Sequence, residues 1–328
     1  MQEKNVGSNR LSSLFRTGRL SGAGCMIEGR GLTKIFTPRG QNRITAVDGV
    51  DIRINSGETL ALVGESGCGK STLSRLLLLL IPPTQGEVFF EGQALTGLKQ
   101  KELRLIRRKI QIVPQQPESA LNPRWKIADS ICEPFRIHPD VLPPGKLPEE
   151  ELEKLLELVG LEPEQAARYP HQLSGGELQR AVIARAIALE PALIICDEPT
   201  SMLDVSTQAA IVRLLQALQH RLGCALLFIT HDQGLAHAIG DRTAVMFGGQ
   251  IVEEGQDVLD RPLHPFTRKL TSIPDSASLQ CPELQGNRIP GSCVYYRFCP
   301  EKTKNCLHSP ELKKYDDRKV RCHNISYV

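Results

Sequence analysis

The segment 64–71, Gly-Glu-Ser-Gly-Cys-Gly-Lys-Ser, constrains the fold of this chain more than any other stretch. It fits the pattern G-x-x-x-x-G-K-[ST] at every constrained position. Glycines let the backbone wrap closely around an anion, so that successive N–H groups point at phosphate oxygens. A strand-like run, Thr59–Val63, precedes the loop, and a helical pattern, Lys70–Leu80, follows it. The sequence therefore predicts a phosphate-binding loop between a buried strand and a helix N-terminus.

The chemistry of a bound triphosphate assigns a role to the parts of this loop. The Lys70 amine would reach the β- and γ-phosphates of ATP, and the Ser71 hydroxyl would coordinate Mg²⁺. We expect nine consecutive residues to bind the nucleotide: Gly64, Glu65, Ser66, Gly67, Cys68, Gly69, Lys70, Ser71 and Thr72.

Polar side chains also follow two other predicted strands. The apolar run 193–196 ends in Asp197 and Glu198, and the run Leu226–Thr230 is followed by His231. The carboxyl ends of parallel strands meet at the edge where open α/β sheets bind ligands. We expect Asp197 to complete the Mg²⁺ site, Glu198 to accept a proton from the attacking water or to orient it, and His231 to contact the γ-phosphate. The alternative is an ordinary pair of solvated acids and a structural histidine.

Strands and helices alternate along much of the chain, which predicts the α/β class with a mostly parallel sheet covered on both faces. Residues from about 117 to 190 are mostly helical and interrupt the alternation, as an inserted helical subdomain would. We also expect an antiparallel β subdomain. The expected strands are Val50–Ile54, Thr59–Val63, Gly86–Glu91, Ile110–Val113, Ala192–Cys196 and Ala225–Thr230. The expected helices are Lys70–Leu80, Glu149–Val159, Gly176–Leu189 and Ser206–Leu222.

Composition and charge divide the chain and exclude several classes of protein. We expect residues 1–25 to be a disordered basic tail, 26–262 to be the main domain, and 263–328 to be a proline-rich C-terminal extension. The alternatives for the tail are a short membrane-touching helix at Leu11–Leu20, or a true start of translation at Met26. Forty basic against 37 acidic residues give a net charge of +3, which argues against a nucleic-acid binder. The longest apolar run, Leu76–Ile81, is too short to span a membrane, and no secretory signal is evident.

A second motif carries a resemblance to a known family. Residues 173–177 read Leu-Ser-Gly-Gly-Glu, and a helix containing Gln179 and Arg180 follows. Together with the phosphate-binding loop and the Asp197–Glu198 pair, this resembles the ATP-binding subunit of an ABC transporter, with a P-loop NTPase core. The resemblance implies that two cassettes pair head to tail and enclose ATP between the loop of one and Ser174, Gly175 and Gly176 of the other.

Several further positions match the family one by one. Gln115 resembles the Q-loop glutamine, which implies contact with Mg²⁺ and the attacking water, and Asp204 lies in a segment, 201–204, that resembles the D-loop. Phe36 occupies the place of the aromatic residue that stacks on adenine, although a core phenylalanine is the alternative. The resemblance thus implies catalytic roles for Glu198, His231 and Gln115.

Two short segments, 120–124 and 262–267, are similar to the dipeptide, oligopeptide and nickel importer group. Membership implies an ATPase on the cytoplasmic face of the cell inner membrane that powers peptide import. Its partners would be a second, different ATPase chain, two integral-membrane permease subunits and an extracytoplasmic substrate-binding protein. Nickel or a metal chelate is the alternative cargo. A soluble ABC ATPase that acts on ribosomes or nucleic acid is a rival of another class, and so is a regulatory module without hydrolysis, against which Glu198 and His231 argue.

Half of the ten cysteines fall in the last 48 residues, and four of these, Cys293, Cys299, Cys306 and Cys322, lie within thirty positions. In a reducing compartment metal ligation is a better explanation than disulfides. The spacing lacks the tight pairs of structural zinc sites, so four thiolates holding an iron–sulfur cluster are favoured over zinc or free thiols. The family resemblance implies a [4Fe–4S] cluster here. Cys281 lies outside the pattern.

Overall fold

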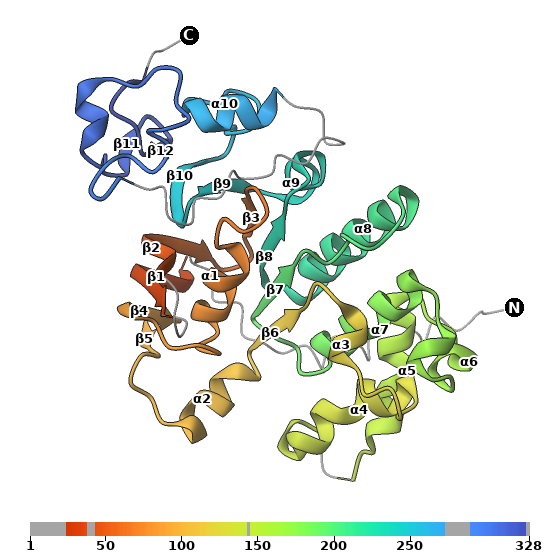
Figure 1. Ribbon diagram of the computed structural model, residues 1–328. Helices are drawn as coiled ribbons and strands as arrows, with labels where there is room; N and C mark the ends of the chain where they lie inside the picture. Colours follow the sequence, from red (N-terminus) through yellow and green to blue (C-terminus); the bar gives the residue numbers. More distant parts are fainter. Residues whose placement is uncertain (1–23, 38–42, 143–144, 273–288, 326–328) are drawn as a thin grey trace, which may run out of the picture.

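The computed structural model describes residues 24–37, 43–142, 145–272 and 289–325 (Figure 1). These residues form two sheets and a separate group of helices. The described strands are β1 (Cys25–Phe36), β2 (Ile44–Asn55), β3 (Thr59–Val63), β4 (Gln85–Phe90), β5 (Gln93–Ala94), β6 (Ile110–Val113), β7 (Leu193–Asp197), β8 (Ala225–Thr230), β9 (Arg242–Phe247), β10 (Gln250–Gly255), β11 (Lys313–Tyr315) and β12 (Arg318–Val320).

The larger sheet has the order β11-β12-β10-β9-β3-β8-β7-β6 within the described residues. The five strands from β9 to β6 run parallel, and β10, β12 and β11 add an antiparallel edge. Every residue of β3, β7 and β8 is buried, because helices and the second sheet cover both faces of the main sheet. This explains why the sequences of these strands are nearly continuous apolar runs. The predicted mostly parallel sheet is confirmed.

The smaller sheet is antiparallel, with the order β2-β1-β4-β5. Its apolar face packs with helix α1 (Lys70–Leu77) and the main sheet in one core, which includes Ile27, Ile54 and Leu73. The expected antiparallel β subdomain is therefore present. Phe36, the proposed adenine contact, is the last residue of β1.

Helices α3 to α7 gather at one end of the molecule, and the C-terminal segment (blue) lies at the opposite end (Figure 1). They pack with α8 on one core with Leu156, Ile183 and Ile211 among its members, which confirms the inserted helical subdomain. The described helices after α1 are α2 (Gln100–Arg107), α3 (Pro117–Ala120), α4 (Ile127–Ile137), α5 (Pro148–Val159), α6 (Pro163–Ala166), α7 (Gly175–Ile187), α8 (Val205–Leu222), α9 (Gln233–Ile239) and α10 (Pro265–Thr271).

Most expected elements agree with the structure to within one or two residues. However, β2 begins at Ile44 and not at Val50, and α1 ends at Leu77 and not at Leu80. The backbone of Leu79 has a φ of 48°, so the chain has already left the helix before the two prolines that follow Ile81. Strands β9 and β10 lie outside the expected elements. None of the described helices has the length and apolar character that crossing a membrane requires.

The C-terminal extension continues the main sheet. Its hairpin β11–β12 pairs with β10, so that Glu253 lies opposite Val320. The predicted boundary at residues 262–263 remains a prediction. At the other end of the chain, β1 already begins at Cys25 and includes Met26, while the rest of the expected tail, with Leu11–Leu20, lies outside the described residues.

Candidate active site

The phosphate-binding loop connects the end of β3 to the first residue of α1. Gly67 and Gly69 have φ values of 78° and 111°, which side-chain-bearing residues rarely adopt. A Cβ on Gly69 would lie 2.2 Å from the Ala46 carbonyl oxygen, and one on Gly64 would lie 2.3 Å from the Met246 carbonyl oxygen. The glycines of the motif therefore allow two neighbouring backbone segments to approach the loop closely.

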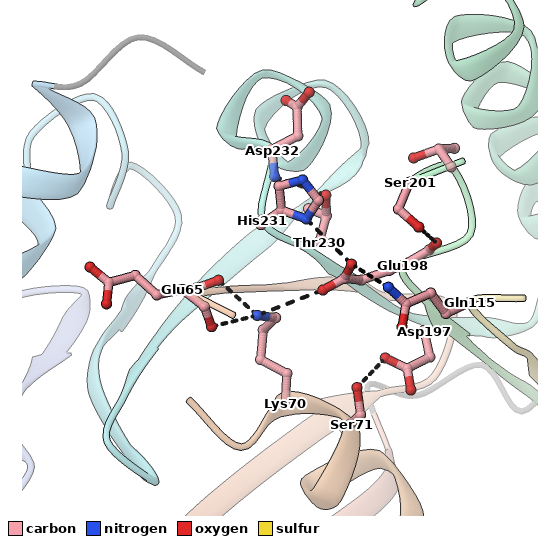
Figure 2. Close-up of polar contacts among 12 residues, drawn as sticks. Glu65, Lys70, Ser71, Gln115, Asp197, Glu198, Ser201, Thr230, His231 and Asp232 are labelled. Carbon is pink, nitrogen blue, oxygen red and sulfur yellow. Dashed lines mark hydrogen bonds and ion pairs between the residues drawn. The ribbon is translucent and has the colours of Figure 1, made fainter. Parts of the chain in front are cut away.

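Lys70 is only 4% exposed, and its amine lies inside the loop. Its Nζ donates to the carbonyl oxygens of Gly64 and Glu65, at 2.7 and 2.9 Å, and lies 3.9 Å from Glu198 Oε1 (Figure 2). A buried ammonium group held at the centre of a glycine loop is suited to meet phosphate oxygens.

Ser71 and Asp197 meet directly, although 126 positions separate them in the chain. The Ser71 hydroxyl donates to Asp197 Oδ1 at 2.9 Å. Burial is the main cause that raises the pKa of Asp197, and the hydrogen bond from Ser71 opposes it. A hydroxyl and a carboxylate side by side are oxygen donors of the kind that Mg²⁺ prefers, so the pair fits the expected ion.

Glu198 is the point at which the other polar side chains converge (Figure 2). Gln115 Nε2 donates to its Oε2 at 3.0 Å, and His231 Nδ1 lies 3.3 Å from the same oxygen. The hydrogen bond from His231 is the main cause that lowers the pKa of Glu198, with the Lys70 charge acting in the same direction against burial. Glu198 is thus an anion at neutral pH and can accept a proton.

Backbone geometry fixes this carboxylate at the end of β7. Glu198 has a φ of 49°, a left-handed conformation that is strained for a residue with a side chain. Its N–H donates to the Ile229 carbonyl oxygen at 3.0 Å, which ties it to the neighbouring strand β8. The hydrogen bond between the Glu198 and His231 side chains also raises the pKa of His231. The strand ends predicted to meet therefore do meet.

The signature residues lie on the helical group, apart from this cluster. Ser174 caps α7 in a capping box: its hydroxyl oxygen accepts from the Glu177 N–H at 3.4 Å, and its own N–H donates to Glu177 Oε2 at 2.7 Å. A Cβ on Gly176 would lie 2.7 Å from a methyl group of Thr207, because α7 packs on the start of α8. No hydrogen bond or ion pair of the described residues joins Ser174, Gly175 or Gly176 to the loop 64–72.

Asp204 and Phe36 also lie outside the cluster. Asp204 caps α8 and accepts from the Ser206 hydroxyl at 2.5 Å and from the Thr207 hydroxyl and N–H at 2.7 and 3.0 Å. These hydrogen bonds, that of Ser206 above all, hold the pKa of Asp204 far below the usual range. Phe36 is 38% exposed and has the Lys34 amine 5.3 Å from its ring centroid, so it is not a core residue.

The four clustered cysteines are close enough to influence one another's ionisation. Burial is the main cause that raises the pKa of Cys293 to about 11, and Cys306, Cys322 and Cys299 add to the effect. The nine cysteines that the structure describes are free thiols. However, the described part of the chain has no group of three His, Cys, Asp or Glu side chains arranged to hold a metal ion. The geometry gives the iron–sulfur prediction no support, and Cys281 lies outside the described residues.

Two features of the loop were not predicted from the sequence. The first is the turn after β9, where the Gly249 N–H donates to the Cys68 carbonyl oxygen at 2.9 Å. The apolar run of β9 followed by two glycines was the signal that could have indicated it. The second is Glu65, whose carboxylate is buried and points away from Lys70 (Figure 2).

Comparison with known proteins agrees with this geometry. A model of the ABC transporter family matches residues 47–201. The oligopeptide transport ATP-binding protein OppF of Escherichia coli is 43% identical over 302 residues, which cover 86% of this chain and 88% of OppF. The chain belongs to the ABC transporter family. It is an ATP-binding, ATP-hydrolysing subunit of that family.

Two further relatives extend the family comparison. The di/tripeptide transport ATP-binding protein DppF of Pseudomonas aeruginosa is 39% identical over 299 residues, covering 87% of this chain and 92% of DppF. Among solved structures, the dimeric post-hydrolysis state of the ATP-binding cassette MJ0796, bound to ADP and phosphate, superposes with a TM-score of 0.65 at 33% identity. That match covers 70% of this chain and 98% of the cassette.

Proposed function

We propose that this subunit hydrolyses ATP between two paired cassettes and thereby powers the import of peptides through separate permease subunits. The observation that carries the proposal is the position of Glu198, which contacts Gln115, His231 and Lys70 at once. A carboxylate in that position combines proton acceptance with proximity to the amine that binds phosphate.

In this mechanism the loop 64–72 binds the phosphates through its backbone N–H groups and the Lys70 amine. Ser71, Asp197 and Gln115 hold Mg²⁺, which supplies positive charge to the phosphate oxygens when bound. Glu198 accepts the proton of the attacking water, and Gln115 and His231 orient its carboxylate. Phe36, at the end of β1, stacks on the adenine ring.

A partner cassette completes the site. Ser174, Gly175 and Gly176 lie at the N-terminus of the thirteen-residue helix α7, where the helix dipole and free N–H groups favour an anion. Because these residues lie apart from the loop of their own chain, they face the γ-phosphate held by the partner's loop in a head-to-tail dimer. Asp204 belongs to the same interface, where the neighbouring Met202 and Val205 are 67% and 82% exposed.

The cargo and the remaining partners follow from the relatives. OppF and DppF are named for oligopeptide and di/tripeptide transport, which favours peptides over the alternative cargo, nickel or a metal chelate. We infer a different ATPase chain as the dimer partner, two permease subunits, an extracytoplasmic binding protein, and a place on the cytoplasmic face of the inner membrane.

The test is to purify the subunit with its permease partners, reconstitute the complex in vesicles, and measure ATP hydrolysis with and without the loaded binding protein. We expect di- to oligopeptides to stimulate hydrolysis and nickel to leave it unchanged. Stimulation by nickel alone would show that the cargo is nickel and not a peptide. Co-sedimentation of the subunit with ribosomes and not with membranes would refute the transport function altogether.

For the C-terminal extension we propose a [4Fe–4S] cluster on Cys293, Cys299, Cys306 and Cys322. The support comes from the sequence, in which four cysteines lie within thirty positions. The described side chains are not arranged to hold a metal, so they would have to move to form the ligand set. The test is iron, acid-labile sulfide and zinc analysis of anaerobically purified protein, with Cys306→Ser compared against the remote Cys25→Ser. Four irons and four sulfides per chain, lost only in Cys306→Ser, are expected. Zinc alone, or no metal, would refute the cluster.

A further inference from the structure

Tyr295 connects the cysteine segment of the C-terminal extension to the back of the phosphate-binding loop. The side chain is 2% exposed and belongs to a core that includes Val63, the residue directly before the loop. Its ring centroid lies 5.1 Å from that of Phe247, edge to face, and 5.5 Å from that of Phe266. Aromatic pairs at these distances have defined orientations, so the position of one ring restrains the next.

Phe247 links this aromatic core to the loop, because backbone atoms before and after it in the chain contact residues of the loop. The carbonyl oxygen of Met246 lies only 2.3 Å from the position that a Cβ on Gly64 would occupy. Beyond Phe247, the Gly249 N–H donates to the Cys68 carbonyl oxygen at 2.9 Å. Displacement of the Phe247 ring therefore moves backbone atoms that support the first and fifth residues of the loop.

Glu65 provides a second connection between the loop and Tyr295. It is 5% exposed, and one of its carboxylate oxygens is buried without a hydrogen-bond partner among the described residues. Burying such a group unsatisfied is costly, so its position requires an explanation. Burial is the main cause that raises the pKa of Tyr295 to about 12, and the charges of Cys299 and Glu65 contribute. The Glu65 carboxylate thus points away from Lys70 (Figure 2), and its charge acts on the Tyr295 hydroxyl group.

The segment 262–267, which resembles the importer group in sequence, packs against the rings of Phe247 and Tyr295 through Phe266. Glu253 is fully buried and accepts from the N–H groups of Leu263 and His264, both at 2.9 Å. His264 Nδ1 accepts from the Phe266 N–H at 3.0 Å, and the Phe266 ring lies 4.5 Å from Phe247. The histidine of this segment therefore fixes the Phe266 ring, which packs against both Phe247 and Tyr295.

We propose that Tyr295 is a positioning residue of the nucleotide site: through Phe247 and Glu65 it holds the loop 64–69 in the conformation that binds phosphate. The proposal rests on the assignment of this loop as the ATP site. It predicts that loss of the Tyr295 ring loosens the loop and weakens nucleotide binding, whereas the chemical step, which depends on Glu198, proceeds normally once ATP is bound.

The test compares Tyr295→Leu with Tyr315→Leu, a matched change on β11 outside the aromatic core, in the full-length subunit. We expect Tyr295→Leu to raise the Kd for ATP, measured without Mg²⁺ to prevent turnover, and the KM roughly tenfold, with kcat within about twofold. Amide hydrogen exchange should accelerate in residues 64–69 and not in 174–178. Tyr295→Phe, which keeps the ring, should restore most of the affinity. Equal affinity and exchange in Tyr295→Leu and Tyr315→Leu would overturn the proposal.

A double-mutant cycle tests the coupling between Tyr295 and Glu65 even if Tyr295→Leu does not fold. Tyr295→Phe and Glu65→Gln each preserve side-chain size, and we expect their effects on ATP affinity to deviate from additivity by roughly threefold or more. Additive effects would overturn the role of Glu65. Lys70→Ala separates this outcome from failure of the ATP-site assignment: if it binds ATP as the wild type does, the loop itself is not the site.

Discussion

Replacing Glu198 by glutamine preserves the size of the side chain and removes its ability to accept a proton. Gln115, which lies 3.0 Å from Oε2, could still donate to an amide oxygen, so the local geometry should persist. A general base contributes about 10²- to 10⁴-fold to the rate. We therefore expect kcat for ATP hydrolysis to fall at least about 100-fold, which corresponds to about 2.7 kcal/mol of transition-state stabilisation. Binding of ATP should persist or tighten, because one negative charge near the γ-phosphate is gone.

Two measurements check this reasoning. Steady-state phosphate release gives kcat, and equilibrium titration gives the Kd for ATP. Each is compared with Glu190→Gln, the same substitution at an exposed glutamate just before β7. NMR titration of the imidazole should also show that the pKa of His231 falls toward its ordinary value of about 6.5, since Glu198 is the main cause that raises it. Hydrolysis within tenfold of the wild-type rate would refute the assignment of Glu198 as the base.

Three further predictions concern the same cluster. Lys70→Ala should raise the Kd for ATP by roughly 100-fold in calorimetry, because charge-assisted hydrogen bonds contribute about 1.5–3 kcal/mol each. Gly69→Ala should abolish nucleotide binding and lower the melting temperature more than Gly67→Ala does, because only Gly69 has backbone oxygen 2.2 Å from the added methyl group. The raised pKa of His231 should contribute stability below pH about 6.5 that is lost as the pH rises through the folded-state pKa. Urea unfolding should show this loss in the wild type and not in His231→Gln.

The sequence was most informative where the decisive interactions are local. Thr59–Val63, the glycine loop and the start of α1 at Lys70 were predicted correctly, because an apolar run, a turn and a helical period are properties of neighbouring residues. The convergence of Asp197, Glu198 and His231 also followed, since parallel strands place their carboxyl ends at one edge. The role of Gln115 was predicted only from the family resemblance, because a glutamine two residues after a four-residue strand indicates no chemistry of its own.

The C-terminal extension was the least predictable part. Strands β11 and β12 have three residues each, too few for an alternating pattern to be recognised. Their pairing with β10 joins segments more than sixty residues apart, which no local pattern specifies. Glu65 is buried in the folded chain, although its residue type and its place in a glycine-rich loop indicate an exposed side chain. Burial of a charged side chain is therefore a tertiary outcome here.

The pairing of β12 with β10 has a consequence for incomplete copies of the protein. Glu253 is fully buried, and Arg318 of β12 lies 3.8 Å from its carboxylate. A chain interrupted before residue 318 would leave that carboxylate without its cation and β10 without its outer neighbour. An uncompensated buried charge is strongly destabilising, and an uncovered strand edge invites aggregation. We expect such a copy to unfold readily and to be degraded by cellular proteases.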